Sequence, residues 1–351
     1  MPQGYNNVMK GRICIVPKVT SMGGVGTFML KLSAGLAARG LEITHDLNDP
    51  ACDCILVLGG RRDLIGLWHA KKRGIPIVQR LDGINWVQRR RRTSFRHYLR
   101  AEYGNWNLSM IRKHLAGRIV YQSEFARNWW EDWYGAKESP SHVVHNGVDL
   151  GIYSHNGTHN RPGDRIRMLV VEGSLGGGYD MGLENAVYLA EKLADEYRYP
   201  MELMVVGKVK PEQQAAWQAK SRIPLVWRGL VPRDQIPEID RSAHILFSAD
   251  INPACPNAVI EALACGLPVV AFDTGALSEL VPSAAGRIVP YGGDPWKLEP
   301  PDIPSLAEAA AEVLGDLPRF QVGARAQAEA ALGLGKMVDG YLEALFPSGG
   351  D

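Results

Sequence analysis

The stretch Asp250–Asp273 constrains the fold of this chain more than any other, because it combines a helix start, a helix stop and an apolar strand. Pro256 suits the first helical turn, since its ring fixes φ and its missing N–H is not needed there. Gly266 suits the position after a helix, and Pro268 prevents the helix from continuing. Val269–Phe272 is wholly apolar, which is typical of a strand covered on both faces. The stretch therefore predicts loop, helix and strand of an α/β fold.

The start of this predicted helix is a candidate anion site. The first amides of a helix have no partner within it, and the helix dipole places partial positive charge there. Glu261 is four residues after Asn257 and so shares its helix face, where it can accept hydrogen bonds from hydroxyl groups beside a bound anion. The alternative, a core helix with one structural Glu, stays open on local grounds.

Length and composition allow two soluble domains. The 351 residues are 46% hydrophobic and 22% charged, which is ordinary for globular proteins. No apolar run approaches the roughly 18–20 residues that span a bilayer, and the N-terminus lacks a signal-peptide pattern. Five cysteines without a C-x-x-C pair indicate reduced thiols. We therefore expect a cytoplasmic protein.

The net charge of +1 hides an asymmetry between the two halves. Residues 1–160 contain 22 Lys and Arg against 12 Asp and Glu, a net of +10, and the remainder contains 17 against 26, a net of −9. Opposite signs on two halves favour two domains with different partners.

Strands and helices alternate along both halves, which predicts two parallel α/β sheets. We expect an N-terminal domain over residues 1–158, a linker within Tyr153–Asp164, and a C-terminal domain over residues 164–334. The last helix, at Gly335–Leu345, is expected to pack back on the first domain. Expected strands are Arg12–Pro17, Leu41–His45, Cys54–Leu58, Pro76–Leu81, Arg118–Gln122, His142–His145, Arg167–Glu172, Glu202–Val206, Leu225–Trp227, His244–Phe247 and Val269–Phe272.

The segment Asn85–Gly117 interrupts this alternation with basic and aromatic residues. Such a segment suits a surface rich in anionic lipids, where each Lys or Arg contributes on the order of 1 kcal/mol. It would also suit nucleic acid, and a solvated charged helix is the plainer interpretation. We expect peripheral association with an anionic membrane and no nucleic-acid partner. The residues expected on this acceptor or membrane surface are Arg89, Arg90, Arg91, Arg92 and Arg96.

Three motifs in this order resemble the retaining glycosyltransferases of family 4. They are the glycine-rich loop at Gly23–Gly26, the Asn-Gly-Val-Asp turn at Asn146–Asp149, and the signature E-A-x-A-x-G-x-P-V-V-A beginning at Glu261. The resemblance covers nearly the whole chain. It implies the GT-B fold, in which two Rossmann-like domains face a cleft that holds the active site. It also implies transfer of a sugar, with retention, from a nucleotide-diphosphate sugar to an acceptor that the sequence does not identify.

The chain departs from the family pattern at three places. Pro253 stands eight residues before Glu261, where the family has a Glu that contacts donor-sugar hydroxyls. Ser174 and Tyr179 stand about where the family has an Arg and a Lys on the diphosphate. Asp82 stands where many members have a His beside the reacting centre.

The resemblance, with these departures, assigns roles to particular residues. Asp82 is the candidate catalytic residue, orienting the donor sugar or the acceptor hydroxyl; a structural ion pair with Arg80 is the alternative. Glu261 would hold the ribose, the amides at the helix start would hold the diphosphate, and Lys208 or Arg228 would replace the missing cations. The full set of expected donor-binding residues is Gly24, Ser174, Gly177, Lys208, Arg228, Ala254, Cys255, Asn257, Ala258, Val259 and Glu261.

Two other functions stay open. Gly24-Val-Gly26 with Asp46 about twenty residues on imitates a dinucleotide fingerprint, although Met29 occupies the third glycine position. A catalytically inactive protein could instead use the basic first half to bind membrane or nucleic acid. The nine His show no metal-ligand spacing and no Asp-x-Asp cluster occurs, so we expect no metal cofactor.

Overall fold

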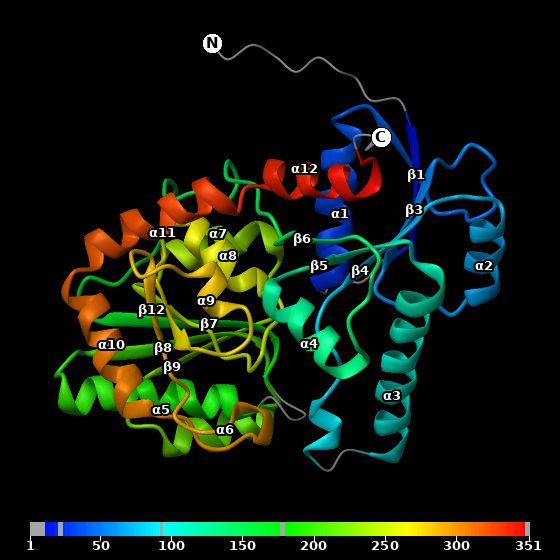
Figure 1. Ribbon diagram of the computed structural model, residues 1–351. Coiled ribbons are helices and arrows are strands. Elements are labelled where there is room, and N and C mark those ends of the chain that lie inside the picture. Colours follow the sequence, from blue (N-terminus) through cyan, green and yellow to red (C-terminus); the bar gives the residue numbers. More distant parts are fainter. Residues whose placement is uncertain (1–10, 20–23, 92–93, 176–179, 348–351) are drawn as a thin grey trace, which may run out of the picture. The chain divides into compact units, whose positions relative to one another are not determined.

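The computed structural model describes residues 11–19, 24–91, 94–175 and 180–347. The chain divides into two compact units: the first contains the residues up to Gly147 together with those from Leu334 onward, and the second contains Val148–Gly333. Each unit holds one six-stranded sheet within the described residues, and all paired strands are parallel (Figure 1). The prediction of two Rossmann-like α/β sheets is confirmed.

The sheet of the first unit has the strand order β2-β1-β3-β4-β5-β6. Because β2 and β3 lie on opposite sides of β1, the order reverses beside β1, and ligands bind outside the carboxyl ends of parallel strands at such a point. The elements of this unit are β1 (Gly11–Val16), α1 (Gly24–Ala37), β2 (Leu41–Thr44), β3 (Cys54–Leu58), α2 (Leu64–Lys72), β4 (Ile77–Leu81), η1 (Val87–Arg89), α3 (Phe95–Met110), η2 (Ile111–Leu115), β5 (Arg118–Tyr121), α4 (Glu124–Tyr134), β6 (Ser141–Val143) and α12 (Leu334–Leu345).

The last helix, α12, packs on α1 in the core of the first unit. The rings of Tyr341 and Phe28 lie 5.2 Å apart between centroids, and Val338 is fully buried. A Cβ on Gly35 of α1 would lie 2.4 Å from Val338 Cγ2, so the glycine allows the two helices to approach this closely. Apolar contacts therefore attach the end of the chain to its first sheet.

The sheet of the second unit has the strand order β12-β11-β10-β7-β8-β9, which reverses between β10 and β7. The same rule places a ligand site outside the carboxyl ends of these two strands. The elements are β7 (Ile166–Ser174), α5 (Asp180–Glu196), β8 (Met201–Lys208), α6 (Pro211–Lys220), β9 (Leu225–Gly229), η3 (Arg233–Gln235), α7 (Ile236–Arg241), β10 (Ile245–Phe247), α8 (Asn257–Ala264), β11 (Val269–Phe272), α9 (Leu277–Leu280), β12 (Gly286–Val289), η4 (Pro295–Lys297), α10 (Ile303–Gly315) and α11 (Leu317–Ala331).

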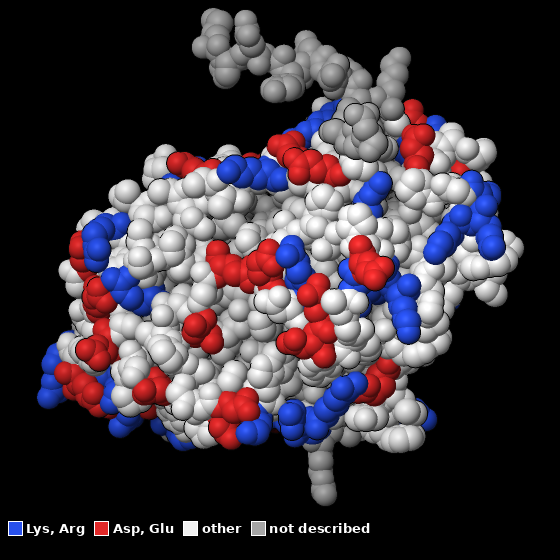
Figure 2. Space-filling view, viewed as in Figure 1, with Lys and Arg blue, Asp and Glu red and all other residues white. Residues whose placement is uncertain are grey.

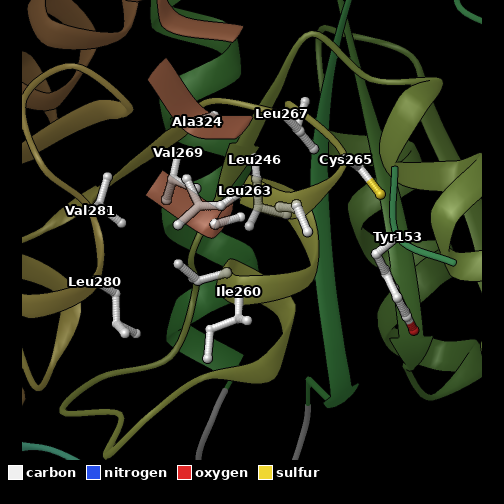
Figure 3. Close-up of a cluster of buried hydrophobic side chains, with 14 of the residues drawn as sticks. Tyr153, Leu246, Ile260, Leu263, Cys265, Leu267, Val269, Leu280, Val281 and Ala324 are labelled. Carbon is white, nitrogen blue, oxygen red and sulfur yellow. The ribbon is translucent and has the colours of Figure 1, made fainter. Parts of the chain in front are cut away.

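Helix α8 is held in the core of the second unit. Figure 3 shows Ile260 and Leu263 of α8 among Leu246 of β10 and Val269 of β11, and all four belong to one buried cluster. Burying side chains of this size stabilises the fold by about 2 kcal/mol each, before the cost of ordering them. The position of the helix start is therefore fixed by the core and not by the loop before it.

The segment expected to be a linker belongs to the second unit instead. The chain passes between units at Gly147–Val148, and Tyr153 is buried in the second unit's core. Arg325 of α11 donates to the carbonyl oxygens of Tyr153 and Leu150, and Arg241 of α7 donates to those of Ser154 and Thr158. These long-range hydrogen bonds order a segment whose Asn, Gly and His composition predicts a loose connection.

Charge is mixed on the visible surface. On the face shown in Figure 2, Lys and Arg side chains are interspersed with Asp and Glu side chains. Among the described residues, no helix is both long enough and apolar enough to cross a membrane.

Candidate active site

The start of α8 presents backbone amides, as the sequence predicts for this stretch. Pro256 is the N-cap residue, and within the described chain no side chain caps this end. The amides of Asn257, Ala258 and Val259 belong to the first turn, whose N–H groups have no acceptor within a helix. Asn257 and Ala258 are half-buried. This helix start is therefore suited to an anion such as a phosphate.

The loop before α8 has a fixed conformation. Pro253 is buried, and its carbonyl oxygen accepts a hydrogen bond of 2.8 Å from the amide of Ala276. Gly275, at φ +62°, lies so close that a Cβ there would be 2.4 Å from Pro253 N. Asn252 also takes a left-handed conformation, at φ 57°. The loop thus carries Ala254, which is half-buried, and Cys255, which is buried, in a set geometry toward the helix start.

Glu261 lies one turn further along α8 and is only 8% exposed. Its charge acts on two buried neighbours. Burial, and secondly the charge of Glu261, raise the pKa of Tyr153 and hold the pKa of Asp240 well above its usual range. Glu261 therefore places a carboxylate in a region of low polarity, where hydrogen bonds from hydroxyl groups would be strong.

A pair of carboxyl groups at the strand ends was missed by the sequence analysis. Glu172 lies near the end of β7, and Asp250 follows β10, the strand paired with β7. Burial raises the pKa of Asp250 to about 6. Burial also raises the pKa of Glu172 well above its usual range, and the charge of Asp250 raises it further. At neutral pH this pair can hold a proton, so it can both donate to and accept from hydroxyl groups.

The candidate cations lie along the same edge of the sheet. Ser174 of β7 pairs in register with Lys208, the last residue of β8, and both are exposed. Gly207, at φ +139°, allows this approach, because a Cβ there would lie 2.1 Å from the carbonyl oxygen of Glu172. Arg228 is exposed on β9, two strands from β7. Gly177 lies outside the described residues.

One further cation escaped the sequence analysis. Arg233 follows β9, and its Nη2 atom is buried without a hydrogen-bond acceptor among the described residues. The charge of Arg233 acts on Tyr153, which is also a neighbour of Glu261. A basic residue after a strand end was the signal that could have identified it.

Asp82 lines a separate cavity in the first unit. The cavity measures about 340 Å³ and lies at the carboxyl ends of β3 and β4, with Arg61 and Tyr103 also in its wall. The Asp82 carboxylate is 3.9 Å from Arg80 Nη1 and 37% exposed, and its backbone carbonyl accepts a 2.7 Å hydrogen bond from Trp130 Nε1. Val25, beside Gly24 at the start of α1, also lines the cavity. Asp82 therefore pairs with Arg80 and also lines the cavity.

Comparison with known proteins gives the family. A sequence model described as Glycosyl transferases group 1 matches residues 173–316, and one described as Glycosyltransferase Family 4 matches residues 58–151. The chain belongs to the group 1, family 4 glycosyltransferases.

Individual known proteins are similar to this chain in sequence or in fold. The chain is 26% identical over 141 residues to 2-deoxystreptamine glucosyltransferase of Streptomyces kanamyceticus, a match that spans 39% of this chain and 34% of that enzyme. Sucrose-phosphate synthase from Thermosynechococcus elongatus has a similar fold, with a TM-score of 0.68 at 16% identity over 93% of this chain and 96% of that one. HepE from Anabaena, solved with UDP and glucose, gives a TM-score of 0.66 at 13% identity over 95% and 99%. These likenesses confirm the GT-B fold class.

Membership in this glycosyltransferase family removes the dinucleotide-binding alternative. In a dinucleotide-binding fold the first strand passes into the first helix through a tight glycine turn. Here β1 ends at Val16, several residues before Gly24, the first glycine of the motif in the sequence, and Met29, at the third glycine position, is buried in the core of the first unit. The glycines of this loop thus do not form a dinucleotide fingerprint.

The basic segment of the first unit is only partly available to a surface. Arg89 pairs with Glu102 at 2.6 Å and lies over the ring of Trp133. Arg90 and Arg96 are exposed, Arg91 is half-buried, and Arg92 lies outside the described residues. The start of α3 also exposes large apolar side chains, among them Phe95 at 74%.

The three tryptophans of α4 divide between core and surface. Trp129 and Trp130 are buried, whereas Trp133 is 38% exposed and lies under Arg89. The apolar face of α4 therefore packs mainly inward.

Proposed function

We propose that the protein transfers a sugar from a nucleotide-diphosphate sugar to an acceptor. The observation that carries this proposal is the uncapped start of α8, with Glu261 one turn on, at the reversal point of the second sheet in a chain of this family. Anions bind at such helix starts, and ligands bind at such reversal points. HepE, which has a similar fold, was solved with UDP and with UDP-glucose, which supports UDP as the first donor nucleotide to test.

The second unit would hold the donor. In this proposal the amides of Asn257–Val259 bind the diphosphate and Glu261 accepts hydrogen bonds from the ribose hydroxyls. Lys208, at the end of β8, supplies countercharge in place of the cations that the family has after β7. Backbone amides carry no net charge. The charge of Lys208 therefore matters more than it would in a family member that already has an Arg and a Lys on the diphosphate.

The carboxyl pair would contact the donor sugar. Pro253 cannot make the hydrogen bonds that a Glu at its position makes in the family. Glu172 and Asp250 lie at adjacent strand ends, at the reversal point of the same sheet. We assign to this pair the sugar-hydroxyl contacts that Pro253 lacks. Glu172→Gln should then raise KM for the donor sugar while the Kd for free UDP is unchanged; an equal change in both would contradict the assignment.

The first unit would hold the acceptor, with its hydroxyl near Asp82. In the proposed reaction the bond between the sugar's anomeric carbon and the phosphate oxygen breaks, and a bond from the acceptor oxygen to the same face of that carbon forms. The acceptor proton passes to the departing phosphate, while Asp82 orients the hydroxyl. The product therefore keeps the anomeric configuration of the donor, which proton NMR of the product measures directly. An inverted product would instead make Asp82 a general base.

The reaction is proposed to need no metal, because the chain lacks an Asp-x-Asp cluster for a metal–diphosphate contact. Transfer rates measured with excess EDTA and with added Mg²⁺ should agree. A rate that depends on Mg²⁺ would contradict this part of the proposal.

We also propose that the start of α3 contacts an anionic membrane surface. Arg96 and Arg100 are exposed on α3 together with Phe95 and Leu99, so charge and apolar surface occur on one short segment. Removing two arginines at about 1 kcal/mol each should weaken binding to anionic vesicles by roughly 30-fold. Sedimentation with phosphatidylserine vesicles would compare Arg96→Ser/Arg100→Ser with Lys72→Ser on α2. Equal sedimentation of the two variants would refute the contact.

A further inference from the structure

The second unit contains a cavity of about 570 Å³ at the C-terminal end of α8. Cys265 and Gly266, which follow α8, form part of its wall, and α11 forms another part. The candidate donor site lies at the opposite end of α8, about 12 Å away along eight residues at 1.5 Å each. The cavity is therefore separate from the site described above.

Basic side chains dominate the polar wall of this cavity. The lining includes Arg161, Arg241, Arg325, His155 and His159, and Glu329 is the one acidic residue among the lining residues. Glu329 is already paired, because it lies 2.7 Å from Arg325 Nε. Arg325 has structural partners besides, since it also donates to the carbonyl oxygens of Tyr153, Ala264 and Leu150. The positive charge left over belongs to Arg161 and Arg241.

Among the described residues neither of these two arginines forms a salt bridge, although the charge of Arg241 acts on the neighbouring Asp240. Arg241 uses Nε and Nη1 on the carbonyl oxygens of Thr158 and Ser154, which leaves Nη2. Arg161 uses only Nε, on the carbonyl oxygen of Arg241, so both of its terminal nitrogens lack a protein acceptor in the described chain. Burial lowers the pKa of Arg161, a sign that its charge is incompletely solvated. A partly buried cation without a counter-ion is unfavourable, and a bound anion relieves this cost.

We propose that this cavity is a binding site for a small phosphate ester. Arg161 would receive the phosphate in the planar, forked geometry that guanidinium groups offer to such anions, with Arg241 and the two imidazoles beside it. The volume lies within the 300–1,000 Å³ range of small-molecule sites, which is more than a phosphate alone needs. Val322, at the same cavity, is 72% exposed and offers an apolar contact to the organic part of the ligand.

The site does not depend on the proposed transferase activity, and binding tests it directly. Isothermal titration with ribose 5-phosphate should give saturable binding to the wild-type chain in the presence of saturating UDP, with inorganic phosphate binding more weakly. Arg161→Gln should weaken ribose 5-phosphate binding at least about tenfold, as loss of a charge-assisted hydrogen bond does. Arg222→Gln, on an exposed turn of the same unit, is the matched control and should bind like wild type.

A second readout locates the ligand. The pKa values of the His155 and His159 imidazoles should rise when ribose 5-phosphate binds, because a phosphate favours the imidazolium form. The signals of the two rings are assigned with His→Gln variants. Unchanged affinity in Arg161→Gln, or shifts confined to other imidazoles, would overturn the proposal. If Arg161→Gln fails to fold, His155→Gln decides, since it should weaken binding without removing the hydrogen bond that the Arg161 amide donates to His159 Nδ1.

Discussion

Glu261→Gln separates a ribose-binding carboxylate from a structural one. The substitution keeps the shape of a side chain that is 8% exposed, so it opens no cavity. It removes a negative charge that now raises the pKa of the neighbouring Asp240. Folding stability should therefore be unchanged or slightly higher. Thermal unfolding of the free protein checks this part.

The same change should weaken donor binding strongly. Two ribose hydroxyls on a carboxylate make charge-assisted bonds worth about 1.5–3 kcal/mol each, and the amide of Gln keeps part of this. A net loss of about 3 kcal/mol corresponds to roughly 100-fold in Kd for UDP. Isothermal titration measures it, with Glu308→Gln on the exposed side of α10 as control. A Kd within a factor of three of wild type would refute the ribose contact, and a large drop in melting temperature would make Glu261 structural.

Three further predictions follow from the site and its surroundings. Asp82→Asn should lower the transfer rate at least about tenfold while the Kd for UDP stays constant, because Asp82 lies in the first unit; a raised Kd would contradict this placement. The Asp250 pKa of about 6 means that folding stability falls as pH rises from about 4 to 6. The free energy of unfolding of Asp250→Asn, measured with urea, should therefore exceed that of the wild type by on the order of 3 kcal/mol at pH 7 but by little at pH 4. The ring of His244 accepts a hydrogen bond of 2.9 Å from the Arg167 amide, and burial lowers the pKa of His244 to about 4. The wild type should therefore lose folding stability as pH falls from about 6.5 to 4. The variant His244→Gln should lack this acid-dependent loss in thermal melts at pH 7 and pH 5, and an identical loss would exclude His244 as its source.

The elements predicted well are those whose ends carry local signals. Pro256, Gly266 and Pro268 bound α8 and β11 within one residue of the expected positions, and β11 spans the expected Val269–Phe272. Helix α7 was missed because it has only six residues and contains Pro237. Strand β12 was missed because it is only half-buried and lacks an apolar run.

Site features that depend on strand order were not accessible to sequence reasoning. Glu172 and Asp250 are 78 positions apart, and only the pairing of β7 with β10 brings their strand ends together. The partner of Arg89 was hidden for a similar reason. Glu102 lies about two turns into α3, and only the fold turns it toward Arg89. Local pattern identified the family and the helix start, whereas the carboxyl pair required the topology.

Binding of UDP to the second unit tests the central claim most directly. Isothermal titration of the full chain with UDP, repeated with the variant Glu261→Gln and without metal, should show one saturable site that the variant weakens about 100-fold. A screen of UDP-sugars, GDP-sugars and other nucleotide sugars would then identify the donor by hydrolysis or transfer. If no nucleotide or nucleotide sugar binds the wild-type chain, the proposed transferase function is wrong, and a binding role without catalysis takes its place.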